Sequence, residues 1–233
     1  MSKKYELVVD DTITFWGWKL FRIRALISFG SVDAGDLGGY IYTEDNLSQK
    51  GDAWVSGDAK VWGDAKVSGN AKVSGNAEVS GDAKVWGDAE VWGNAKVWGN
   101  AKVLGNAEVS GDAEVLGNAE VSGNAKVSGD AEVWGNAKVW GNAEVSGDAE
   151  VWGNAEVSGD AKVSDFEDVI VFKNHWSSGR HFTYTKSNKM WRVGCFYGTG
   201  QELIDKAYRD SEKSGNFYKA YVEFIASLEG LGE

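Results

Sequence analysis

A strict six-residue repeat dominates this chain. Nineteen consecutive copies of Gly-[Asp/Asn]-Ala-[Lys/Glu]-Val-[Ser/Trp/Leu] run without insertion from Gly51 to Ser164, and the first copy carries Trp54 at its fourth position. Because side chains alternate along an extended chain, an even-numbered repeat keeps each position on one side throughout. Glycine, alanine and valine share one side, and the mostly polar positions share the other, which predicts an inside and an outside. An α-helix would turn the valines by about 240° per repeat and does not fit.

The first two positions of each repeat predict a corner. Glycine tolerates any backbone region, and Asn and Asp accept left-handed conformations more readily than other residues. A short strand, a corner and another short strand together make a polygonal coil. Coils stacked about 4.8 Å apart would satisfy each other's backbone groups. No single coil can hide its own interior, so we expect the stability to come from stacked neighbours.

The sixth position indicates how many repeats make one coil. Taking every third repeat gives a register in which five of six residues are apolar: Trp62, Ser80, Trp98, Leu116, Trp134 and Trp152. The other two registers are half apolar and one-seventh apolar, and taking every second repeat separates nothing. We therefore predict an all-β solenoid with three repeats per coil, a triangular cross-section and about six coils.

The repeats resemble those of the hexapeptide-repeat proteins. An aliphatic residue followed four positions later by a small one, as in Val61-Trp-Gly-Asp-Ala65, is typical of that family. The flanks, Leu20-Phe-Arg-Ile-Arg-Ala before the repeats and Trp191-Arg-Val-Gly-Cys-Phe after them, are similar to those of uncharacterised bacterial and prophage hexapeptide-repeat proteins, some labelled acyltransferases. The resemblance implies a left-handed parallel β-helix, and side-by-side trimers are common in the family.

The two flanks predict separate end structures. Residues 1–50 should form an N-terminal β cap, with strands over Tyr5–Phe15 and Trp18–Phe29 joined by a turn at Trp16-Gly17. Residues 165–233 should form a small C-terminal α+β module that acts as a cap or an assembly unit. Its expected strands are 169–172, 181–185 and 190–196. A capping box over 199–202 predicts a helix to Lys213, a break at 214–216 and a second helix beyond.

Composition limits the partners and the compartment. The net charge is −11, and the repeats contribute 9 − 18 = −9 of it. This acidity disfavours nonspecific binding to nucleic acid or to anionic membranes. No apolar run reaches the ~18 residues that a membrane span needs, and no signal peptide is evident. The single cysteine, Cys195, suits a reducing compartment. We expect a cytoplasmic protein, located in the host cytoplasm if it is phage-encoded.

The register containing Trp62 and Trp152 is the strongest candidate site. A contiguous apolar row on a solenoid surface marks a contact. We expect another subunit, in a dimer or trimer, or the C-terminal helices to cover it. Alternatively, sugars or bases could stack on its indoles.

Two corner columns also call for an interpretation. Asp112, Asp130 and Asp148 fall in one column, where solvated corners or a bound cation would explain the stacked like charges. Asn100, Asn118, Asn136 and Asn154 fall in another, where we expect a ladder of amide hydrogen bonds.

Catalytic residues are sparse in this sequence. The repeats contain no histidine, and only His175 and His181 could serve as the general base of a hexapeptide acyltransferase, with acetyl-CoA as its cofactor. Both are more economically explained as ordinary surface or packing residues. Cys195 lies in an expected strand and should be a buried thiol. We see no metal site with a recognisable spacing of ligands.

The sequence therefore favours a nonenzymatic, rigid β-solenoid scaffold or interaction protein that self-associates and requires no cofactor. Three alternatives remain: a DNA-mimic inhibitor of a nucleic-acid-binding host protein, an acyl-CoA-dependent acyltransferase, and a small-molecule or glycan binder at the tryptophans. The aspartate columns motivate the first, although interleaved lysines weaken it.

Overall fold

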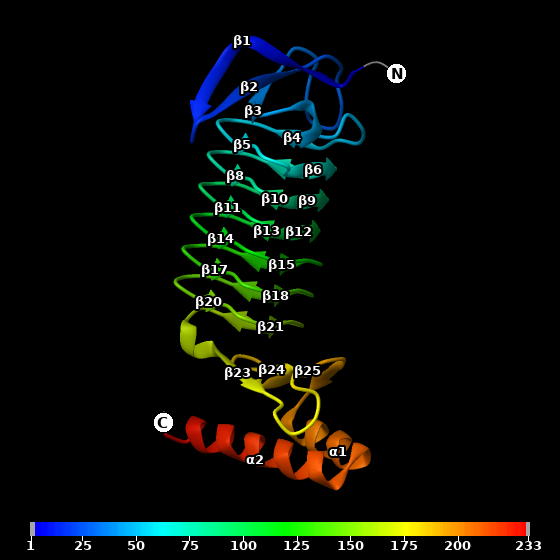
Figure 1. Cartoon of the computed structure of the whole chain (residues 1–233), viewed down its shortest axis with the longest axis vertical. Coiled ribbons are helices and arrows are strands. Elements are labelled where there is room, and N and C mark those ends of the chain that lie inside the picture. The colour runs from blue at the N-terminus through cyan, green and yellow to red at the C-terminus, as the bar shows by residue number, and fades with distance from the viewer. Residues whose placement is uncertain (1–2, 232–233) are drawn as a thin grey trace.

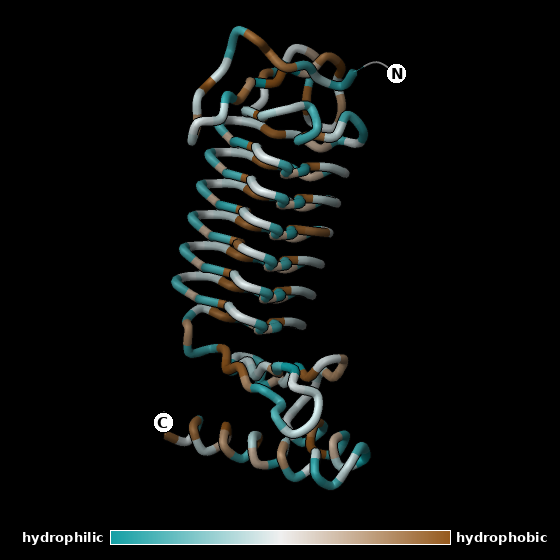
Figure 2. Tube along the Cα trace, viewed as in Figure 1, coloured by the Kyte–Doolittle hydropathy of each residue, from teal (hydrophilic) through white to brown (hydrophobic). Residues whose placement is uncertain are grey.

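A computed structural model describes residues 3–231 as a parallel β-solenoid of about seven coils with an extra structure at each end (Figure 1). Hydrophobic and hydrophilic segments recur at the same place in successive coils (Figure 2). Parallel strands pair residues that lie eighteen apart, as in Val61 with Val79 and Val97 with Val115. The predicted solenoid and its eighteen-residue period are confirmed.

Three sheets form the three sides of the coil. The first contains β1 (Tyr5–Phe15), β2 (Trp18–Ala25), β3 (Leu37–Ile41), β5 (Lys60–Val61), β8 (Glu78–Val79), β11 (Lys96–Val97), β14 (Glu114–Val115), β17 (Glu132–Val133) and β20 (Glu150–Val151). The second contains β4 (Trp54–Val55), β7 (Lys72–Val73), β10 (Glu90–Val91), β13 (Glu108–Val109), β16 (Lys126–Val127), β19 (Glu144–Val145) and β22 (Lys162–Val163). The third contains β6 (Lys66–Gly69), β9 (Lys84–Gly87), β12 (Lys102–Gly105), β15 (Glu120–Val121), β18 (Lys138–Val139) and β21 (Glu156–Val157).

The core of the solenoid consists of the alanines and valines of the repeats. Every one of them, from Ala53 to Val163, is at most 1% exposed. Burial of each valine contributes roughly 1.5 kcal/mol or more from apolar area alone. The repeat glycines form the corners, and all have φ between 63° and 87°, the region that L-residues with side chains avoid. The alanines and valines therefore face inward as predicted, whereas the glycines, which were expected on the same side, lie at the corners, and none of them is buried.

The first coil begins before the repeats. Ile41 of β3 pairs with Val61, and Leu47, which follows the short 3-10 helix η1 (Glu44–Asn46), pairs with Val67. The Asn46 side-chain amide donates to the carbonyls of Gly63 and Ala65, at 3.0 and 2.9 Å. This side chain thus supplies the donors that a regular strand would give to the next coil.

The N-terminal hairpin β1–β2 closes the open end above that first coil. The Tyr5 hydroxyl donates to the Leu47 carbonyl at 2.7 Å, and the Lys4 ammonium donates to the carbonyls of Gly51 and Ala53 at 3.2 and 2.8 Å. Lys4 is only 3% exposed. Burial lowers the pKa of Lys4 to about 8, and the nearby Asp52 carboxylate partly offsets this effect.

At the other end, the short 3-10 helix η2 (Phe166–Asp168) leads into an antiparallel sheet. The sheet contains β23 (Val169–Lys173), β24 (His181–Thr185), β25 (Met190–Val193) and β26 (Phe196–Gly198), and the helices α1 (Gly200–Asp210) and α2 (Glu212–Glu229) follow it. The Thr183 hydroxyl accepts from the Glu156 N–H at 3.0 Å, and the Tyr197 hydroxyl donates to the Ser158 carbonyl at 3.2 Å. These bonds attach the sheet to the last coil. No helix within residues 3–231 is long and apolar enough to cross a membrane.

Two local expectations for this C-terminal region are wrong. The capping box at Thr199 and Glu202 is present, but α1 ends at Asp210, and the segment 214–216 lies inside α2 rather than between helices. Ser211 ends α1 and caps α2, and Gly215 packs so closely on Tyr208 that a Cβ would lie 2.3 Å from its ring. The expected strand over 190–196 is interrupted by a turn, which leaves Cys195 exposed rather than buried.

Corner stacking gives a first testable prediction. A Cβ at Gly93 would lie 2.8 Å from the carbonyl oxygen of Gly111 in the next coil, whereas a Cβ at Gly153 would meet no atom within 4 Å. Both glycines have positive φ, so Gly153→Ala is a control for backbone strain alone. We expect Gly93→Ala to lower the free energy of unfolding by roughly 1–3 kcal/mol more than Gly153→Ala in denaturant titrations. Equal losses would mean that the coils do not stack this closely.

The buried lysine gives a second prediction. The unfolded chain keeps the Lys4 proton up to a pH of about 10.4, whereas the folded chain releases it near 8. The unfolded state therefore binds more protons in that window, so this group's contribution to stability increases as the pH rises through it. We expect the free energy of unfolding of the native chain to gain roughly 1–2 kcal/mol relative to Lys4→Met between about pH 7 and about pH 9.5. A difference independent of pH would contradict the low pKa.

Candidate interaction surface

Trp62, Ser80, Trp98, Leu116, Trp134 and Trp152 form what we call the tryptophan column. Each residue directly follows a strand of the first sheet, from β5 to β20, and lies one coil from the next. The backbone holds this spacing, because the N–H groups of Trp98 and Trp134 donate to Val115 and Val151 of the following coil, both at 3.0 Å. The eighteen-residue register thus places these side chains in one row.

The N-terminal hairpin covers the first part of this column. Trp62 is 8% exposed and packs with Leu20 and Tyr40. The Phe15 ring meets the Trp62 ring edge-on, with 5.3 Å between centroids. Figure 1 shows β1 descending beside the first coils. From the sequence we expected another subunit or the C-terminal helices as the cover, and not the N-terminal hairpin.

The other end of the column is uncovered. Trp134 is 39% exposed and Trp152 is 56% exposed. Their rings stack with centroids 5.7 Å apart and an interplanar angle of 16°. Leu116, one coil before Trp134, is partly buried. Neither the hairpin nor the helices α1 and α2 bury this pair, so it is an apolar surface within a largely polar exterior.

Where the hairpin meets the column, four indoles line an open cavity of about 330 Å³. Trp16 and Trp18 come from the turn and the start of β2, and Trp62, Ser80 and Trp98 come from the column. Trp16 is 77% exposed and has a φ of 50°, an uncommon conformation for a bulky side chain. The Trp98 Nε1 atom is buried without a hydrogen-bond partner among the described residues. In the sequence, the feature that could have indicated this cavity is the pair of tryptophans on either side of Gly17.

The corner columns contain the predicted amide ladder. The Asn100 amide donates to Asn118 at 2.9 Å, Asn118 donates to Asn136 at 3.0 Å, and Asn136 donates to Asn154 at 3.3 Å. The expected ladder is confirmed.

The aspartate column lies at another corner, below a ladder of its own. The Asn94 amide donates to the Asp112 carboxylate at 2.8 Å, and Asp130 and Asp148 follow in the next two coils. Among residues 3–231, no group of three or more His, Cys, Asp or Glu side chains is placed to hold a metal ion. A cation at this column stays a prediction.

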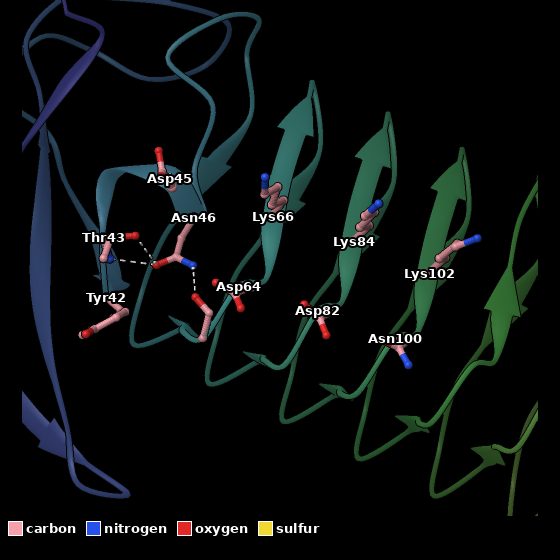
Figure 3. Close-up of a pocket in the computed structure, with 11 residues that line it drawn as sticks. Tyr42, Thr43, Asp45, Asn46, Asp64, Lys66, Asp82, Lys84, Asn100 and Lys102 are labelled. Carbon is pink, nitrogen blue, oxygen red and sulfur yellow. Dashed lines mark hydrogen bonds between the residues drawn. The ribbon is translucent and has the colours of Figure 1, made fainter.

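A larger, open hollow of about 640 Å³ extends from η1 along the next coils (Figure 3). Lys66, Lys84 and Lys102 form one row along it, and Asp64, Asp82 and Asn100 form a parallel row at the corner (Figure 3). The charges balance approximately, because Asp45 adds a third carboxylate. The hollow is therefore polar and does not favour one sign of ligand charge.

The two histidines lie apart from the tryptophan column, in the C-terminal module. His175 is exposed and contacts the rings of Trp176 and Phe217, with centroids 5.4 and 5.2 Å away. His181 is exposed at the start of β24 and lines a cavity of about 260 Å³ together with Cys195. A role for either histidine as a general base stays a prediction.

Comparison with known proteins assigns no family to the chain. No protein-family model matches the chain, and a search of curated proteins finds no match.

Proposed function

We propose that the chain is a nonenzymatic, rigid β-solenoid scaffold that self-associates through the exposed end of the tryptophan column, which comprises Trp134 and Trp152 with the partly buried Leu116 beside them. The observation that carries the proposal is the stacked pair Trp134–Trp152, which is solvent-exposed although the start of the same column is buried. Exposed contiguous apolar surface of this kind marks protein contacts in otherwise polar exteriors.

Rigidity follows from the way the coils are joined. Backbone hydrogen bonds connect each coil to the next on all three sides, as those from Lys96, Lys102 and Glu108 illustrate, with lengths of 2.9, 2.9 and 3.0 Å. Ladders of asparagine amides reinforce the corners. Such a rod holds the hairpin and the C-terminal module at a fixed separation, as a scaffold must.

A second copy of this chain is the partner that best fits the exposed row. Two copies that meet about a two-fold axis present the same patch to each other, so Trp134 of one copy could pack on Trp152 of the other. An aromatic side chain can pack on this column, because the Phe15 ring of the hairpin already contacts the Trp62 ring. Glu132 and Glu150 flank the exposed indoles in sequence, so added salt should strengthen the association by screening their repulsion.

Bacterial or prophage origin and a cytoplasmic location are part of this proposal. They are supported by the resemblance of the repeats to hexapeptide-repeat proteins and by the single cysteine. The scaffold needs no cofactor to perform this role.

Replacement of the exposed indoles tests the assembly. We expect the native chain to have a multiple of the single-chain mass by light scattering, and Trp134→Ser/Trp152→Ser to be a folded monomer. Serine is already the sixth residue of many repeats, including Ser80 in the same column, so the coil should tolerate it. Trp86→Ser is the matched control, because Trp86 is 61% exposed but lies in a different register.

Two outcomes would overturn the assembly. One is a native chain that is monomeric at every salt concentration. The other is a Trp86→Ser variant that dissociates as fully as the double variant, since the contact would then not be specific to the tryptophan column.

A further inference from the structure

The cavity between the hairpin turn and the tryptophan column lies where a serine interrupts the row of large apolar side chains. Trp62 and Trp98 lie two coils apart, and Ser80 occupies the intervening coil. Where successive coils both carry tryptophan, as at Trp134 and Trp152, the indoles stack and fill the row. Ser80 carries a smaller side chain at this position and lines the cavity together with Trp16 and Trp18 of the turn.

The turn is held in a costly conformation. Trp16 and Gly17 both have positive φ, at 50° and 83°, as the tightest hairpin turns require. Asn or Gly normally occupies the first of these positions, and a side chain as large as tryptophan is strained there. Trp16 is also 77% exposed, so burial does not explain its presence. Residues held in rare backbone conformations cluster at functional sites, including ligand sites.

One tryptophan of the cavity wall has an unpaired hydrogen-bond donor. Trp98 Nε1 is buried and has no partner within residues 3–231. A buried N–H left unpaired is costly, but this atom has almost no accessible surface, so a ligand oxygen reaches it only when the Trp98 side chain moves. The Ser80 side chain lies in the same wall and is 8% exposed. The walls therefore offer indole faces together with a few polar atoms.

The lining of the cavity consists of four tryptophans and Ser80, so none of the residues that line it is charged. The Lys96 ammonium lies 5.4 Å from the centre of the Trp98 ring and pairs with the Glu114 carboxylate at 2.7 Å, so its charge is already balanced. A neutral ligand with apolar faces therefore fits this lining better than an ion does.

We propose that this cavity, lined by Trp16, Trp18, Trp62, Ser80 and Trp98, binds a neutral pyranose ring of a β-linked glycan whose hydroxyl groups are equatorial. Such a ring presents axial C–H groups to an indole face and acceptor oxygens at its edge. The volume of about 330 Å³ suits a single ring and lies at the lower end of small-molecule sites. The site is separate from the exposed end of the column and does not depend on self-association.

Isothermal titration of the native chain with chitotetraose and with cellotetraose tests the proposal. We expect saturable binding of at least one of these oligosaccharides. Ser80→Trp should abolish it by filling the cavity, and Trp16→Ala should weaken it about tenfold by removing one wall. Ser122→Trp is the matched control, since it makes the same change in another register and should bind as the native chain does.

The proposal fails if neither oligosaccharide binds saturably, or if Ser80→Trp binds as tightly as the native chain. It also fails if a nucleoside monophosphate binds at the cavity while both sugars do not. Circular dichroism of each variant shows whether the solenoid is intact. Trp16→Ala removes an exposed side chain and so keeps the test valid if Ser80→Trp does not fold.

Discussion

The close contact between glycine corners of successive coils is the constraint on which the rest of this structure depends. At most corners an added Cβ would fall about 3 Å from the backbone of the glycine eighteen residues later, as at Gly81 and Gly87. This contact sets the spacing at which N–H groups of one coil reach carbonyls of the next. It also brings the valines into continuous columns that exclude water. The tryptophan column and the amide ladders exist because the same spacing applies on the outside of the coil.

The solenoid could be predicted from the sequence because repetition adds up weak signals. The parity of one repeat says little, but nineteen copies leave no other way to bury the valines. The unequal distribution of tryptophan among the three registers then revealed the eighteen-residue period, and strand pairing such as Lys96 with Glu114 agrees with it. The asparagine ladder followed from the same period. Each of these features depends on residues that recur in many repeats. One atypical repeat therefore does not change the predicted fold.

The ends were harder to predict, because each of their contacts occurs once and joins distant parts of the chain. Nothing in the local sequence shows that the turn at Trp16 lies beside Trp62 and Trp98, since this depends on how β1 and β2 fold back over the first coils. Gly215 was read as a helix break from its local preference, but packing against Tyr208 overrides that preference. The exposed Cys195 likewise reflects a turn at Gly194 that apolar neighbours concealed.

Three repeats per coil also mean that the two ends of the molecule are in phase with each other. Removal of eighteen residues would shorten the rod by one coil and leave the hairpin and the C-terminal sheet facing the same directions. Removal of only six residues would rotate the part of the chain after the deletion by a third of a revolution relative to the hairpin. The C-terminal sheet, which contacts Glu156 and Ser158, would then lie under a different side of the triangular coil. The length of this rod can therefore change only in steps of whole coils if its two ends are to keep their relative orientation.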